Sequence, residues 1–139
     1  MKCFWIVGLL SSALLATQPM FASDSICRYI GHYNTRTNTY EGPTWCADIQ
    51  AQNITVRGPL TTSNAVLTGT STVSSMIHAT ETKFTAIEMT NNHSPEKIYL
   101  KNNSIVSGNI VFRGLKGVVY KDASSTISGN VIHADVINQ

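Results

Sequence analysis

The chain has 139 residues, of which 13% are charged and 42% are hydrophobic, and its formal net charge is +2 at pH 7. This near-neutral balance gives no basis for a nucleic-acid partner, which would require a concentrated excess of Lys and Arg. The low share of charged residues also disfavours a helical bundle with a charged surface. No stretch after residue 25 has the 3.6-residue apolar period of an amphipathic helix.

Residues 1–22 have the pattern of a secretory signal peptide. A basic residue precedes an apolar run at residues 3–16, and Ala22 is a small residue at the expected cleavage position. The run is too short to span a bilayer, since a spanning helix needs about 20 apolar residues. We expect cleavage before Ser23 and export to the periplasm or the medium, with no stable membrane insertion afterwards. An uncleaved anchor is the alternative, because Met20 is a poor residue two places before the cleavage position.

Residues 23–48 are predicted to form a β-hairpin closed by one disulfide. Cys27 and Cys46 are the two cysteines left after cleavage, and in an oxidising compartment they should pair. Two free thiols are the alternative. Closing a loop of this size should stabilise the fold by about 3 kcal/mol. The hairpin would then cap the domain that follows it. The aromatic side chains expected to cover that end are Tyr29, Tyr33, Tyr40 and Trp45.

Residues 49–139 are predicted to form a parallel β-helix. Two consecutive segments of 17 residues, beginning at Val56 and Val73, align without a gap and place Leu67 on Phe84. A repeat of this length is too short for paired helices. It suits one turn of a coil, whose apolar side only the next turn can cover. The other aligned pairs are Leu60 with Ile77, Thr68 with Thr85, and Gly69 with Ala86.

A second repeat matches residues 106–115 with residues 127–136 at an offset of 21. Both copies carry Ser-Gly-Asn, and we expect Asn109 and Asn130 to stack at a corner and to bond to one another's backbone. The longer period needs extra residues, which we expect in a corner at residues 116–125. Two unrelated tight turns are the alternative. The aligned pairs are Val106 with Ile127, Ile110 with Val131, Val111 with Ile132, and Leu115 with Val136.

The expected fold class is therefore all-β, with about four or five rungs in the coil. Thr, Ser and Val alternate across residues 53–90 and fit a pleated surface. An antiparallel sandwich is the competing fold, because alternation alone does not exclude it, but the two repeat periods favour the coil. Pro95 interrupts the repeat and predicts a protruding loop at residues 91–96. The side chains expected to point inward are Leu60, Leu67, Ile77, Phe84, Leu100, Ile110, Val131 and Ile132.

Short repeats rich in Thr, Ser and Val, with Gly-Asn corners, resemble the bactofilin-type polymer-forming proteins of bacteria over residues 50–137. The resemblance implies a small right-handed parallel β-helix that associates end to end through its terminal rungs, without nucleotide or metal. The chain departs from that family in its export signal and in its disulfide-tied hairpin. Bactofilins are typically cytoplasmic scaffolds without such a cap.

The predicted cap leaves only the C-terminal rung of the coil open, and one open end that meets its own copy gives a closed two-fold dimer. We therefore expect an exported, non-enzymatic structural or interaction protein that self-associates through this rung. The side chains expected at the centre of the contact are Val131, Ile132, Val136 and Ile137.

The sequence contains none of the catalytic, phosphate-binding or metal-binding motifs that carry known chemistry, such as HExxH, CxxC or GxSxG. We expect no catalytic residue, metal or cofactor. The alternative function is a secreted glycan-binding or glycan-cleaving protein, whose partner would be a glycan or another component of the cell envelope. Its candidate contacts are Glu81 and Glu88, the nearest thing to a pair among the widely spread carboxylates, and His93 in the protruding loop.

Overall fold

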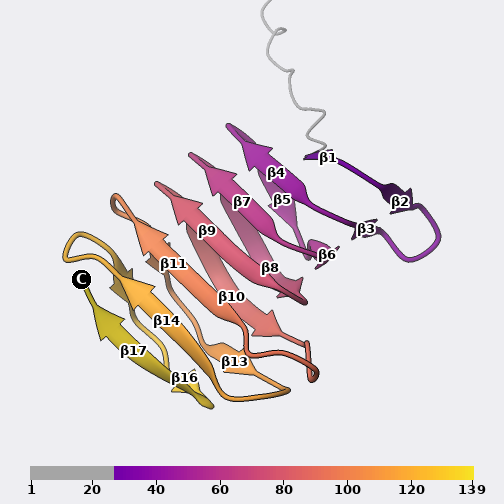
Figure 1. The fold of residues 1–139 in the computed structure, drawn as a ribbon. Coiled ribbons are helices and arrows are strands. Elements are labelled where there is room, and N and C mark those ends of the chain that lie inside the picture. The colour runs from indigo at the N-terminus through magenta and orange to yellow at the C-terminus, as the bar shows by residue number, and fades with distance from the viewer. Residues whose placement is uncertain (1–26) are drawn as a thin grey trace, which may run out of the picture.

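The computed structural model describes residues 27–139, which form 17 short strands and contain no helix. The strands build a parallel β-solenoid of about 6 turns, so the predicted all-β class and the coil are confirmed (Figure 1). The signal peptide predicted at residues 1–22 lies outside the described residues.

One side of the coil is a sheet of seven strands in the order β1-β4-β7-β9-β11-β14-β17. Every neighbouring pair is parallel except β1 and β4, which are antiparallel. The strands are β1 (Arg28–Tyr29), β4 (Thr44–Ala47), β7 (Leu60–Ser63), β9 (Met76–Thr80), β11 (Lys97–Lys101), β14 (Gly117–Lys121) and β17 (Ala134–Asn138).

The rest of the coil is a ten-stranded sheet, in which the longest strands each pair with two shorter strands of a neighbouring turn. The first half of β8 (Val66–Val73) pairs with β5 and its second half with β6, and β10 (Lys83–Met89) pairs in the same way with β12 and β13. The remaining strands are β2 (His32–Asn34), β3 (Thr39–Glu41), β5 (Gln50–Gln52), β6 (Thr55–Arg57), β12 (Ile105–Val106), β13 (Ile110–Phe112), β15 (Thr126–Ile127) and β16 (Val131–Ile132).

The predicted hairpin and disulfide are present at the N-terminal end. Cys27 and Cys46 are bonded, with an S–S distance of 2.01 Å, and β2 pairs with β3 in antiparallel fashion. The ring centroids of Tyr33 and Tyr40 lie 4.7 Å apart and form part of a tyrosine cluster. The prediction that Trp45 also covers this end is wrong. Its neighbours in β4 point inward, so strand alternation turns it outward, where it is 36% exposed.

The predicted number of rungs was too low because the hairpin belongs to the coil. Its second arm supplies β3 and β4, which pair in parallel with β6 and β7 of the next turn. The same backbone thus closes the antiparallel cap on one side and makes the first rung on the other. A sequence pattern of two aromatic arms around a turn does not reveal this second pairing.

Most of the predicted stacking is confirmed by the strand register. Val56 pairs with Val73, Leu67 with Phe84, Leu60 with Ile77, Val106 with Ile127, Ile110 with Val131, and Val111 with Ile132. The backbone N–H of Asn130 donates to Oδ1 of Asn109 at 2.9 Å, as expected for the stacked corner.

Two of the predicted pairs are wrong because residues are inserted at unexpected places. Ala86 pairs with Thr70 instead of Gly69, since Gly69, at φ 69°, lies in the left-handed region and the register shifts beside it. Val136 pairs with Val119 instead of Leu115. The additional residues lie between β13 and β14, so the corner predicted at 116–125 contains the strand β14 instead.

The interior is a continuous stack of apolar side chains. Six of the predicted inward residues are buried, namely Leu60, Leu67, Ile77, Phe84, Leu100 and Ile110, and Val131 is partly buried against them. The prediction for Ile132 is wrong, because it follows the inward Val131 in β16 and must therefore point outward; it is 46% exposed.

Candidate functional site

The C-terminal rung ends in strand edges without partners. Among residues 27–139, β15 pairs only with β12, β16 only with β13, and β17 only with β14. Their outer N–H and C=O groups therefore face solvent at the end of the coil, where Figure 1 shows β17 as the last strand. Such an edge is a template for another strand.

The four residues predicted at this end fall into two groups. Val131 and Val136 continue the inward stack, and Val136 is 40% exposed because no further turn among residues 27–139 covers it. Ile132 and Ile137 are on the outer surfaces of their sheets, beside Val111 and Tyr120 of the preceding turn. The end of the coil therefore presents Val131 and Val136 along its axis, and the two isoleucines extend the apolar surface around its side.

Lys121 limits the apolar area of this end. It occupies the inward column between Leu100 and Asn138 in the register. Its Nζ donates a hydrogen bond to the backbone carbonyl of Ser125 at 3.0 Å, so the carbonyl dipole stabilises the ammonium charge. A contact at this end would thus combine a small apolar patch with backbone pairing.

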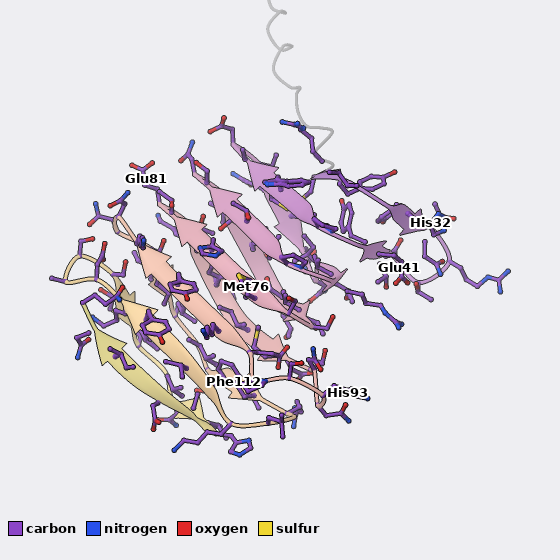
Figure 2. All side chains as sticks on the ribbon, viewed as in Figure 1. His32, Glu41, Met76, Glu81, His93 and Phe112 are labelled. Carbon is purple, nitrogen blue, oxygen red and sulfur yellow. A yellow bond between two sulfur atoms is a disulfide. The ribbon has the colours of Figure 1, made fainter. Side chains whose placement is uncertain are left out.

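A second candidate site is a polar groove of about 650 Å³ along one edge of the ten-stranded sheet. The hairpin turn bounds it on one side and the protruding loop at 91–95 on the other, and Figure 2 shows Glu41 and His93 along this same edge. Its lining includes Asn34, Glu41, Arg57, Ser74, Asn91 and His93.

Internal hydrogen bonds position the groove side chains. Oδ1 of Asn91 accepts from the backbone N–H of His93 at 2.8 Å, and its Nδ2 donates to the carbonyl of Ser74 at 3.1 Å. Asn91 thereby ties the loop to the preceding turn. On the opposite wall, Arg57 Nε lies 3.2 Å from Glu41 Oε1, in an ion pair at the surface.

The three residues predicted for glycan contact do not form one site. Only His93 lines the groove. Glu88 lies in β10 and binds Arg113, with Nη2 and Oε2 2.9 Å apart, while Glu81 lies in the turn before β10. Figure 2 shows Glu81 and His93 on opposite edges of the molecule. This placement gives no pair of facing carboxylates for acid–base cleavage of a glycan.

The groove also contains residues that sequence reasoning missed. Glu41 and Arg57 are partners in the register of β3 and β6. They are 16 residues apart, close to the 17-residue repeat that the sequence shows further along, so extending the repeat backwards could have paired them. No comparable signal joins Asn34 to His93, because their approach depends on how two loops project from different turns.

Among the described residues 27–139, Glu96 is the one buried carboxylate, and it lies next to this region. It precedes β11 and is 1% exposed, and neither of its oxygens has a hydrogen-bond partner. Desolvation raises its pKa to about 7, although the nearby backbone N–H groups of Asn91 and Thr90 lower it in part. The protonated, neutral carboxyl is therefore the form best suited to this position.

Within residues 27–139, no three His, Cys, Asp or Glu side chains gather into a metal-binding cluster. The same part of the chain has no helix long and apolar enough to span a membrane. No protein-family model matches the chain, and comparisons with curated proteins and with solved structures find no significant match.

Proposed function

We propose that the protein is an exported, non-enzymatic structural or interaction protein that self-associates through its C-terminal rung. The observation that carries the proposal is the asymmetry of the two ends. At the N-terminal end, antiparallel β1 and β2 and the Cys27–Cys46 disulfide cover the first turn, and the strand edges that remain there are only two or three residues long. At the C-terminal end, β15, β16 and β17 have free outer edges, and Val136 is partly exposed.

A second copy of the chain is the proposed occupant of this end. A molecule with one self-associating end forms an isologous contact with its copy, and this contact closes as a two-fold dimer. A two-fold axis perpendicular to β17 makes the two copies of that strand antiparallel. Pairing centred on Val136 would then place Ala134 of one copy opposite Asn138 of the other, so the free backbone groups of β17 would be satisfied.

Light scattering coupled to size-exclusion chromatography tests this proposal on the oxidised protein processed before Ser23. We expect a dimer whose fraction rises with protein concentration. Val136→Lys places a charge at the centre of the contact and should give a monomer with an unchanged circular dichroism spectrum. Ile30→Lys is the matched control, because Ile30 is also exposed but lies in the capped end; it should remain dimeric. A wild-type monomer at all concentrations, or a dimer that survives Val136→Lys, would contradict the proposal.

The same proposal predicts an effect of reduction. Without the disulfide, the hairpin loses the covalent tie between Cys27 and Cys46, and the edges of β4 and β3 that β1 and β2 now cover would become available. Reducing agent should then convert the closed dimer into longer assemblies or aggregates. Filaments already present in the oxidised form would show that the N-terminal end is not closed.

Glycan binding in the groove is the second candidate function. The hydroxyl, amide, imidazole and guanidinium groups around the groove offer both donors and acceptors to a polar ligand. Binding to a glycan array should be lost with His93→Ala and Arg57→Gln, and should persist with His32→Ala, which changes an exposed histidine that is not part of the groove lining. Binding that persists in both groove variants would exclude this groove.

A further inference from the structure

The outer face of β9 brings a thioether and an imidazole together. Met76 and His78 are two residues apart in one strand, so both point away from the core, and Ile77 between them is fully buried. Met76 Sδ lies 3.1 Å from His78 Nε2. Both donor atoms are therefore at the surface and within reach of one ion.

A stack of aromatic rings holds the imidazole in place. The ring of His78 is parallel to that of Tyr99, with centroids 4.5 Å apart and an interplanar angle of 3°. Tyr99 stacks in turn on Tyr120, at 4.9 Å. This arrangement fixes the plane of the imidazole, while the flexible side chain of Met76 can move to admit an ion between the two donors.

Met76 is also the accessible sulfur of this part of the chain. Among residues 27–139, the other sulfur atoms belong to Cys27 and Cys46, which are joined in the disulfide, and to Met89, which is fully buried. A soft cation that approaches the described surface therefore meets one sulfur ligand.

We infer that Met76 and His78 form a binding site for a soft monovalent cation, Cu(I) or Ag(I). Thioether sulfur selects soft ions, and imidazole is a good ligand for copper. Zn²⁺ instead prefers four ligands, mostly thiolate, imidazole or carboxylate. Lys97 is the register partner of Met76 in the next strand, and its ammonium group repels a divalent ion twice as strongly as a monovalent one. The site lies on the outer sheet and is independent of the terminal rung.

Titration with silver nitrate in chloride-free buffer tests the inference on the oxidised, processed protein, with native mass spectrometry for stoichiometry and calorimetry for affinity. The readout is the difference in bound Ag(I) between the wild type and each variant, so that silver bound at any other sulfur atom contributes equally to both and cancels. Met76→Leu should remove one bound Ag(I). His78→Gln should weaken binding by at least about tenfold, because even groups that only orient a metal ligand are worth that much. Lys97→Gln should strengthen binding, since it removes the repelling charge.

His93→Gln is the matched control, because it removes a surface histidine that lies in the groove instead of beside Met76. It should bind Ag(I) as the wild type does. The methyl resonance of Met76 should shift on addition of Ag(I), whereas that of Met89 should not. Unchanged silver binding in Met76→Leu, no binding by the wild type at micromolar silver, or tighter binding of Zn²⁺ than of Ag(I) would each overturn the inference.

Discussion

Replacing Glu96 with Gln should remove a pH-dependent loss of stability. The carboxyl of Glu96 is almost completely buried and has no hydrogen-bond partner, and its pKa is raised to about 7 by desolvation. When the chain unfolds, this group returns to its ordinary pKa of 4.5. The folded protein therefore holds a proton that the unfolded chain releases at lower pH.

The sign and the size of the effect follow from these two values. A raised pKa contributes stability that is complete below pH 4.5 and is lost as the pH rises through about 7. The difference between the two pKa values corresponds to about 3 kcal/mol in the free energy of unfolding, an upper value because buried groups relax when they ionise. Above pH 7 the wild type carries the full cost of a buried carboxylate.

Urea denaturation between pH 4.5 and 8, with the disulfide intact, measures this dependence. Wild-type stability should fall across this range, and the difference between Glu96→Gln and the wild type should grow with pH in favour of the variant. Near pH 4.5 the two should be similar, because an amide replaces a neutral carboxyl of the same shape. Glu81→Gln, which changes an exposed carboxyl, is the matched control and should follow the wild type. A difference between Glu96→Gln and the wild type that does not vary with pH would refute the assignment of Glu96 as a buried, neutral acid.

Three further predictions concern the coil and its cap. Replacing both Cys27 and Cys46 with Ser should lower the free energy of unfolding by about 3 kcal/mol, measured by urea denaturation against the oxidised wild type; no loss would mean that the hairpin needs no crosslink. Phe84→Ala should cost about 3–5 kcal/mol because the ring is buried, whereas Leu115→Ala at an exposed site should cost much less; equal costs would contradict the inward stacking. Glu81→Asn should raise the thermal midpoint and stabilise by about 1 kcal/mol, because Glu81 has φ 49° and Asn tolerates the left-handed region; a lower midpoint would show that the Glu side chain makes a compensating contact.

The sequence by itself determined the kind of fold and much of its register. Leu67 aligns with Phe84 one repeat later, and the two lie in adjacent rungs as predicted. Such a repeat is readable because each turn leaves an apolar surface that only the next turn can bury. The disulfide could also be predicted, since Cys27 and Cys46 are the two cysteines that follow the apolar run at residues 3–16.

The candidate sites could be predicted from the sequence only in part. The open rung could be anticipated from Val131 and Val136. His93, in contrast, was grouped with Glu81 and Glu88, whereas the structure places it in the lining of the groove, together with Arg57. Residues that meet in the groove come from different turns, and their approach depends on the length and direction of the loops between strands. The conformational preferences of single residues carry no information about how close such loops come to one another.

Only the tertiary structure decided which face each side chain occupies where the repeat changes length. An inserted residue at Gly69 shifts the partner of Ala86, and residues inserted before β14 bring Val119 instead of Leu115 beside Val136. A slip of one residue reverses the face of every following side chain, because strand side chains alternate. The burial of Glu96, the stacking of His78 on Tyr99 and the stacking of Tyr99 on Tyr120 depend on the same register. The sequence of each turn specifies where a strand forms, but the pairing of that strand with the adjacent turns decides which of its side chains face solvent.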